Sequence, residues 1–288
     1  MLCRFSTPAH PASPPVDTLG RTVLHMCGTD PQSSSKAVID VSCARIAKLL
    51  IGAGFDGDRR CDEGWRPVDV YAALGLPETV AVLVASGVVV NTWDYVYGRS
   101  PLMRAAMNGM KTTVKVLVEG GAKVDYRSGD GSAVTVAVRN EVMGKINMPP
   151  KATPSETTSE TTPRASSSHD WDEFVERQEA TFADTCDPTA RGTQDVVDYG
   201  CEPGKEYFAI VDYLLAAGAD PNFPEEATGR TPIMMASKAG HERLVARLLE
   251  TEKVDLQIAD KDGFGAITYA ETDEIRDMLV DYLVRTIN

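Results

Sequence analysis

One signature recurs along this chain at an interval of about 34 residues, and it restricts the fold more than any other feature. Each copy begins with glycine and keeps the same order of residue types, as in GRSPLMRAAMNGMKTTVKVLVEGGAKVD from Gly98. The interval is 34, 33 and 34 residues for the pairs Gly64 to Gly98, Gly98 to Gly131, and Gly229 to Gly263. A unit of this length cannot bury its own apolar face, so the interval predicts stacked repeats that share a continuous core.

The residues of one unit predict two short helices joined by a turn. In GRTPIMMASKAGHERLVARLLETEKVD from Gly229, Thr231 is a suitable N-cap, and Pro232 stands at the first helical position, where its missing N–H costs nothing. Gly240 can adopt the positive φ that ends this first helix. A second helix follows, with an apolar side made of Leu244, Val245, Leu248 and Leu249. Two helices this short need neighbours of the same kind to cover that side.

These units resemble ankyrin repeats, whose signature is a Gly-x-Thr-Pro-Leu-His-x-Ala-Ala start, a central glycine and a Leu-Leu-x-x-Gly-Ala-Asp-x-Asn end. The matching residues are Gly98, Ser100, Pro101, Leu102, Ala105 and Gly109; Gly229, Thr231, Pro232, Ala236 and Gly240; and LLAAGADPN from Leu214 to Asn222. The resemblance implies an all-α solenoid with short β-hairpin turns. We count about six repeats, which begin near Gly20, Gly64, Gly98, Gly131, Gly229 and Gly263. The last is shortened, as expected of an end cap.

Two stretches interrupt the interval and set the predicted domain organisation. From Gly20 to Gly64 is 44 residues, and the excess falls at DPQSSSKAVID, between the helices of the first repeat. From Gly131 to Gly229 is 98 residues, which leaves a long insert between the helices of the fourth repeat. We predict a flexible tail at 1–16, then repeats one to three and the first helix of the fourth at 17–141. The insert follows at 142–205, and the remaining repeats at 206–288. The fourth repeat, which starts GSAVTVAVRN without a Thr-Pro cap, is predicted to be the least stable.

The insert has the composition of a largely disordered, acidic segment. MPPKATPSETTSETTPRASSSHD is rich in Pro, Ser, Thr and charge, with little to bury. Thr157 and Thr162 have surroundings suited to phosphorylation, and a passive linker is the other interpretation. WDEFVERQEATF then predicts a short amphipathic helix near 169–184. That helix either packs on the edge of the solenoid or serves as an interaction or self-inhibitory motif.

Charge and composition disfavour several classes of partner. The chain has 29 basic and 42 acidic residues, a net charge of −13, which argues against a nucleic-acid or anionic membrane partner. No apolar run is long enough to cross a bilayer, and the start MLCRFSTPAHPASPPVD lacks the long apolar segment of a secretory signal. The six cysteines show no close paired spacing. We expect a cytoplasmic or alternatively nuclear protein that does not insert into membranes and is monomeric by itself.

No group of residues has the spacing of a catalytic, metal or cofactor site. The histidines His10, His25, His169 and His241 are isolated from one another, and no phosphate-binding loop or Gly-x-Ser-x-Gly elbow occurs. His25 matches the histidine of the Thr-Pro-Leu-His start, to which the resemblance gives a structural role. We therefore expect no enzyme, no cofactor and no bound metal.

The resemblance implies protein binding along the concave side formed by hairpin tips and first helices. Trp93, Tyr95 and Tyr97 alternate on one tip, NTWDYVYG, and such rings are enriched at binding hot spots. Packing of these rings against adjacent tips is the alternative. The repeat pattern places five further candidates on the exposed side of first helices, namely Arg104, Met107, Asn108, Met235 and Lys238. Tyr71 stands where the family has a small alanine, and it either opens the local packing or replaces a missing side chain.

These observations favour an intracellular, non-enzymatic scaffold or adaptor that binds partner proteins through the concave face. The alternative is a regulatory or inhibitory subunit that masks an enzyme active site or a targeting signal. A third and weaker interpretation is an enzyme whose site forms only with the insert.

Overall fold

The computed structural model describes residues 16–26, 36–95, 97–146 and 206–287. The chain divides into two compact units, one made of 1–147 with 203–288 and the other of 148–202. Every described residue belongs to the first unit. The predicted tail at 1–16, apart from Val16, and nearly all of the predicted insert lie outside the described residues, including the helix near 169–184, Thr157 and Thr162.

The described residues form pairs of short helices, one pair per repeat. The pairs are α1 (Val23–Met26) with α2 (Lys36–Gly52), α3 (Pro67–Leu74) with α4 (Pro77–Ala85), α5 (Pro101–Met107) with α6 (Lys111–Glu119), α7 (Ala133–Ile146) with α9 (Tyr207–Ala216), and α10 (Pro232–Lys238) with α11 (Glu242–Leu249). Helix α12 (Asp273–Ile287) follows them. Pairing of β type within the described part is limited to the isolated bridges Val16–Thr22 and Ser128–Gly131. The all-α repeat fold is confirmed.

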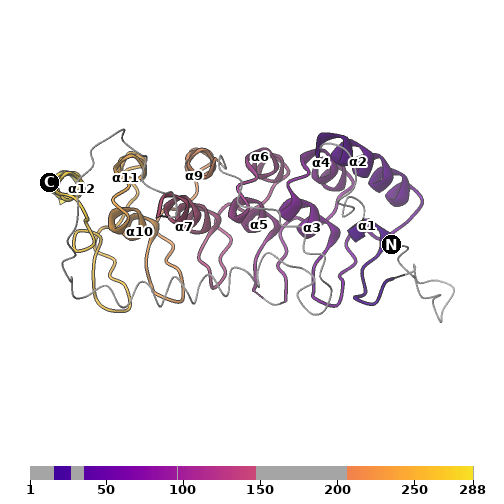
Figure 1. The fold of residues 1–288 in the computed structure, drawn as a ribbon, viewed down its shortest axis with the longest axis horizontal. Helices are drawn as coiled ribbons and strands as arrows, with labels where there is room; N and C mark the ends of the chain where they lie inside the picture. Colours follow the sequence, from indigo (N-terminus) through magenta and orange to yellow (C-terminus); the bar gives the residue numbers. More distant parts are fainter. Residues whose placement is uncertain (1–15, 27–35, 96, 147–205, 288) are drawn as a thin grey trace, which may run out of the picture. The chain divides into compact units, whose positions relative to one another are not determined.

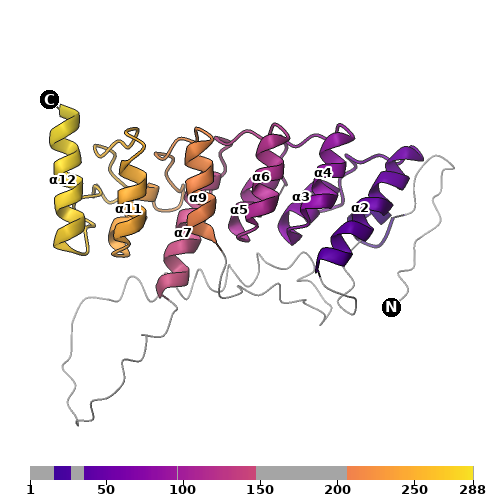
Figure 2. The ribbon, with the colours of Figure 1, turned by 90° about the horizontal axis from the view of Figure 1, so that it is seen from above.

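Within this unit the helices lie in two layers, which Figure 1 shows end-on. In the first layer α1, α3, α5, α7 and α10 contact one another in that order. In the second layer α2, α4, α6 and α9 do the same, and Figure 2 shows this layer with α11 and α12 beyond it. The loops that lead into the first-layer helices project from the side of the first layer that faces away from the second layer (Figure 1). We name these loops the α3 finger (56–66), the α5 finger (88–100), the α7 finger (122–132) and the α10 finger (219–231).

Local signals explain where the first-layer helices begin and end. Pro101 opens α5, and the Ser100 hydroxyl accepts a hydrogen bond from the Met103 N–H at 3.3 Å. Gly240, the second residue after α10, has φ +60°, as predicted. The predicted side-chain cap at Thr231 is wrong, because its hydroxyl is fully buried and has no hydrogen-bond partner in the described part of the chain.

The fourth repeat is capped even though it lacks the Thr-Pro pair. The Ser132 hydroxyl accepts a hydrogen bond from the Thr135 N–H at 3.3 Å, and the Thr135 hydroxyl accepts one from the Ser132 N–H at 3.2 Å. This reciprocal pair starts α7, which runs for 14 residues to Ile146, past the predicted insert boundary at 142.

The first repeat also differs from the prediction at its interruption. Residues KAVID, which were assigned to the excess, are the first residues of α2, and α2 has 17 residues. Asp40 in this stretch is buried and caps the next repeat, because its carboxylate accepts hydrogen bonds from the backbone N–H groups of Glu78 and Thr79 at 2.9 and 2.8 Å. Part of the extra length is therefore an extended helix.

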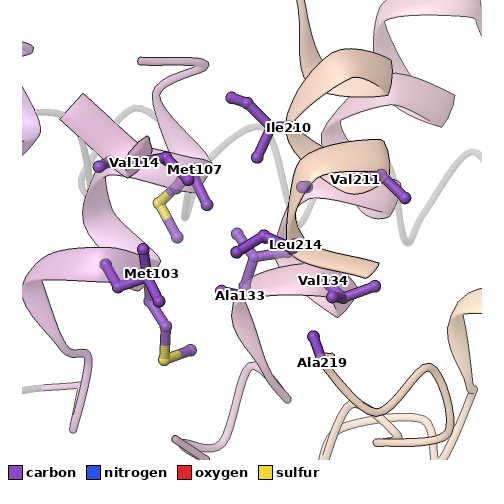
Figure 3. Close-up of a cluster of buried hydrophobic side chains, with 14 of the residues drawn as sticks. Met103, Met107, Val114, Ala133, Val134, Ile210, Val211, Leu214 and Ala219 are labelled. Atoms are coloured by element: carbon purple, nitrogen blue, oxygen red, sulfur yellow. The ribbon is translucent and has the colours of Figure 1, made fainter. Parts of the chain in front are cut away.

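The core continues across the insert. Figure 3 shows apolar side chains of α5 and α6 meeting those of α7 and α9, although the insert separates α7 from α9 in the sequence. The cluster is fully or almost fully buried and includes Met103, Met107, Val114, Ala133, Val134, Ile210, Val211, Leu214 and Ala219. Helix α9 contacts both α7 and α6, so it completes the fourth repeat as predicted.

Two unusual residues of the first repeats are structural. Tyr71 is fully buried and its hydroxyl donates a hydrogen bond to the Leu24 carbonyl at 2.5 Å, so it joins α3 to the four-residue α1. His25 is 1% exposed; its Nδ1 accepts from the Thr22 N–H at 3.1 Å, and its Nε2 donates to the Trp65 carbonyl at 3.1 Å. Burial lowers the pKa of His25, which keeps this bridge between repeats neutral. The structural role expected for His25 is confirmed.

Candidate protein-binding surface

Asp94 lies at the base of the α5 finger and makes hydrogen bonds across it. The Asp94 carboxylate accepts hydrogen bonds from the backbone N–H groups of Tyr97 and Arg99 at 2.6 and 3.0 Å. The Asp94 N–H donates to the Arg99 carbonyl at 3.1 Å and closes the turn. Asn91 joins the finger to the next repeat, since its amide donates to the Gly121 carbonyl and accepts from the Lys123 N–H. These hydrogen bonds support the side chains that the finger carries.

Three aromatic side chains project from this finger. Trp93, Tyr95 and Tyr97 are 49%, 68% and 38% exposed. Each ring also contacts a neighbouring side chain: Trp93 and Tyr95 contact adjacent fingers, as the alternative interpretation expected, and Tyr97 contacts its own finger. Trp93 stacks on Tyr126 of the α7 finger with ring centroids 6.2 Å apart, and the guanidinium of Arg99 lies 4.4 Å from the centre of the Tyr97 ring. The rings are thus both exposed and held in place.

The α3 finger positions the Tyr95 ring. Arg60 lies 4.7 Å from the centre of the Tyr95 ring, and its guanidinium donates hydrogen bonds to the carbonyls of Gly64 and Trp93 at 2.7 and 2.6 Å. Tyr95 rests directly on Gly64, which has φ +83°. A Cβ atom at position 64 would lie 2.4 Å from the Tyr95 ring, so only glycine allows this approach.

Sequence reasoning missed Arg60 and Tyr126, although the repeat interval contains the signal. Arg60, Trp93 and Tyr126 are each 33 residues apart, so they occupy the same position on three successive fingers. Tyr126 is half-buried and Arg60 is partly buried. The surface formed by Arg60, Trp93, Tyr95, Tyr97 and Tyr126 is called the aromatic surface below.

Three candidates on α5 are not on an exposed side. Arg104 is 4% exposed, because its guanidinium pairs with Asp94 at 2.8 Å and lies 3.5 Å from the centre of the Trp65 ring. Met107 is 6% exposed and belongs to the core of Figure 3. The exposed placement predicted for Arg104 and Met107 is wrong.

Asn108 is half-buried because its amide joins two repeats. Its side-chain N–H donates to the Ala73 carbonyl at 2.9 Å. Asn140 makes the equivalent bond to the Met107 carbonyl at 2.6 Å, one repeat later. The Tyr207 hydroxyl donates to the same Met107 carbonyl at 3.0 Å. These bonds stabilise the stack of repeats, and Asn108 is therefore only partly exposed.

The two candidates on α10 lie apart from the aromatic surface. Met235 and Lys238 are partly buried, and the Lys238 amine lies 5.3 Å from the centre of the Tyr269 ring. Helix α7 contacts both α5 and α10 and lies between them. The structure therefore gathers Trp93, Tyr95 and Tyr97 and leaves Met235 and Lys238 on a different repeat.

A row of buried and partly buried ion pairs links the bases of the fingers. Arg99 pairs with Asp130 at 2.5 Å, and Arg139 of α7 pairs with Asp130 at 3.3 Å and with Glu225 at 2.8 Å. Burial would raise the pKa of Asp130, but its hydrogen bonds and charge interactions with Arg99 and Arg139 outweigh that effect and hold the pKa below its ordinary value. These pairs link the α5, α7 and α10 fingers.

No group of three or more His, Cys, Asp and Glu side chains in the described part of the chain is arranged to hold a metal ion. None of the described helices is both long and apolar enough to cross a membrane. What the arrangement does provide is a surface of exposed rings with polar edges, which suits recognition of another macromolecule.

The paired helices, the regular interval and the projecting fingers define an ankyrin-repeat solenoid. Comparison with protein families agrees: the model described as "Ankyrin repeats (3 copies)" matches residues 35–128 and 201–287, more than half of the chain. The protein belongs to the ankyrin-repeat family, whose repeats generally mediate protein–protein interaction.

Several curated proteins share this similarity. The chain is 36% identical over 77 residues to alpha-latroinsectotoxin-Lt1a of Latrodectus tredecimguttatus, and 37% identical over 65 residues to human Rabankyrin-5, covering 27% and 23% of this chain. It is 27% identical over 216 residues, 71% of this chain, to the ankyrin repeat and KH domain-containing protein mask-1 of Caenorhabditis elegans. These matches cover 5%, 6% and 8% of the relatives' own lengths, so the chain spans less than a tenth of each.

Proposed function

We propose that this protein is a non-enzymatic intracellular adaptor that binds a partner protein through the aromatic surface on the α3, α5 and α7 fingers. The observation that carries this proposal is the exposure of Trp93, Tyr95 and Tyr97 on one finger, each ring held by a neighbouring group. Ordered rings lose little conformational entropy when they bind, so such a surface supports affinity at a small cost.

The contacts also indicate what kind of surface a partner meets. Trp93 and Tyr95 present large apolar faces, and the Tyr95 and Tyr97 rings carry hydroxyl groups that can bond to a partner's backbone. Arg60 uses its guanidinium to hold Gly64, Thr92 and Trp93, so it positions the rings more than it offers a free charge. We infer that the rings supply most of the binding energy and that removal of two of them weakens binding by about 30-fold or more.

The test compares the wild type with Trp93→Ala/Tyr95→Ala and with Phe264→Ala as a matched control. Phe264 is also an exposed ring, at 47%, but lies beyond α11 in the last repeat. Proteins captured from a cell extract are identified by mass spectrometry, and the affinity of one purified partner is then measured by calorimetry. Binding should survive Phe264→Ala and be lost in the double variant at unchanged thermal stability. Equal affinity of all three proteins would refute the proposal.

A further inference from the structure

Helix α2, in the first described repeat, has an exposed apolar side. Val38, Val41, Ile46 and Leu49 are 52%, 52%, 41% and 73% exposed. At 100° per residue these four side chains fall within one face of the helix, and the opposite face buries Asp40, Cys43, Ala44 and Ala47. Exposed apolar side chains that gather on one face of a helix mark an interaction surface, so this face indicates a surface that is covered when the protein acts.

The charge on this face of α2 is positive. Arg45 and Lys48 are exposed beside Leu49. The one acidic residue of α2, Asp40, is 4% exposed and points to α4, where it caps the helix. The α2 face, defined as Val38, Val41, Arg45, Ile46, Lys48 and Leu49, is thus apolar and basic although the chain as a whole has a net charge of −13.

Helix α12, in the last described repeat, has a complementary face. Ile275 and Leu279 are buried on its inner side, whereas Val280 and Val284 are 41% and 54% exposed. Asp277 and Asp281 are exposed on the same outer side as these valines. The α12 face, defined as Asp277, Val280, Asp281 and Val284, is therefore apolar and acidic.

We propose that a second copy of this chain covers the α2 face with its α12 face, so that molecules associate end to end. Neighbouring repeats already pack in this way, since α2 lies against α4 and α11 against α12. Contact between two α2 faces would place Arg45 and Lys48 of one molecule opposite the same basic residues of the other. Contact between two α12 faces would place aspartates opposite aspartates, so both contacts bring like charges together. Only the mixed contact pairs opposite charges. Because the two faces differ, the contact is heterologous and builds linear oligomers, not a closed dimer.

Charge reversal gives a test with its own rescue. The full chain is studied by sedimentation velocity from about 5 to about 200 µM, the range in which a modest interface is populated. The wild type should form larger species as its concentration rises, and added salt should weaken them because the paired charges are exposed. Arg45→Glu/Lys48→Glu makes the α2 face acidic, and Asp277→Lys/Asp281→Lys makes the α12 face basic. Each double variant alone should stay monomeric, and an equimolar mixture of the two should associate again.

Controls separate this contact from general effects of charge and folding. Lys253→Glu reverses an exposed lysine outside both faces and should leave association unchanged. Thermal unfolding should be similar for all variants, since each replaced side chain is exposed. A wild type that stays monomeric throughout the range, which is the monomer that the sequence predicts, overturns the proposal. A mixture that fails to associate also overturns it. A third result would also overturn the proposal: the full chain stays monomeric, and only a variant that lacks 169–184 associates. In that case residues 169–184, and not a second copy, cover the α2 face in the full chain.

Discussion

Replacing Asp69 by asparagine should stabilise the protein at neutral pH. Asp69 stands on α3 at the position that the family signature gives to histidine, and it is fully buried. One carboxylate oxygen accepts the Arg66 N–H at 2.8 Å, and the other has no hydrogen-bond partner in the described part of the chain. Burial raises the pKa of Asp69 from its ordinary 3.8 to about 6.

The sign of the effect follows from where the proton is held. Between pH 3.8 and about 6 the folded protein keeps the Asp69 proton, whereas the unfolded chain releases it. The free energy of unfolding therefore falls as the pH rises through this window, and the loss is complete above about pH 6. A pKa difference between 3.8 and about 6 corresponds to about 3 kcal/mol of destabilisation at neutral pH, as an upper figure.

Asparagine keeps an oxygen that accepts the Arg66 N–H and removes the charge. Asp69→Asn should therefore be about 1 to 3 kcal/mol more stable than the wild type at about pH 8, and the two should converge near pH 4. Urea unfolding followed by circular dichroism, repeated at several pH values, measures the difference. An Asp69→Asn protein that is less stable than the wild type at about pH 8, or a difference that does not change with pH, would refute the reasoning.

Asp130 provides a control of opposite sign. Its pKa is held below the ordinary value by Arg99 and Arg139, so its charged form stabilises the fold. Asp130→Asn should therefore be less stable than the wild type at neutral pH. This deficit should narrow only as the pH falls below about 4, through the lowered pKa of the folded state.

Three other results are expected. Asn140→Ala removes the bond to the Met107 carbonyl and should lower the free energy of urea unfolding by about 1 kcal/mol; no change would mean that Tyr207 satisfies this carbonyl alone. Tyr71→Phe leaves the buried Leu24 carbonyl without its hydroxyl donor and should cost about 1 to 2 kcal/mol in thermal unfolding, whereas an unchanged melting temperature would contradict this role. Amide hydrogen exchange should be fastest in the fourth repeat, because the insert between α7 and α9 adds loop entropy. The prediction is wrong if the fourth repeat is the best protected of the repeats.

The paired helices could be predicted from the sequence because their signals are local. Pro101 after Ser100 starts α5, and Gly240 after α10 takes the positive φ that its position required. The apolar spacing of the second helix and the glycine interval then required stacking, whatever the remaining residues were. The cap of α7 was missed because Ser132 and Thr135 satisfy each other without the Thr-Pro pattern.

The burial of candidate side chains could not be predicted, because a repeat pattern gives the position of a Cα atom but not the reach of a side chain. Arg104 leaves the exposed side of α5 to reach Asp94, ten residues earlier, and the Trp65 ring of the preceding finger. Met107 is buried in the core that includes Ile210 and Leu214 of α9, which follows the insert. These contacts lie outside the helix that carries the candidate, so the pattern of that helix does not reveal them.

The aromatic surface depends both on local sequence and on contacts between repeats. Only the rings, which are a local feature of the sequence, were predicted. The rings are visible in one short stretch of sequence, but groups that fix them come from the two neighbouring fingers: Arg60 and Gly64 before them, and Tyr126 after them. A ring that is fixed by neighbouring repeats depends on those repeats being folded. Binding through Trp93 and Tyr95 is therefore coupled to the packing of α3, α5 and α7, and a substitution that loosens this part of the stack weakens binding without contacting the partner.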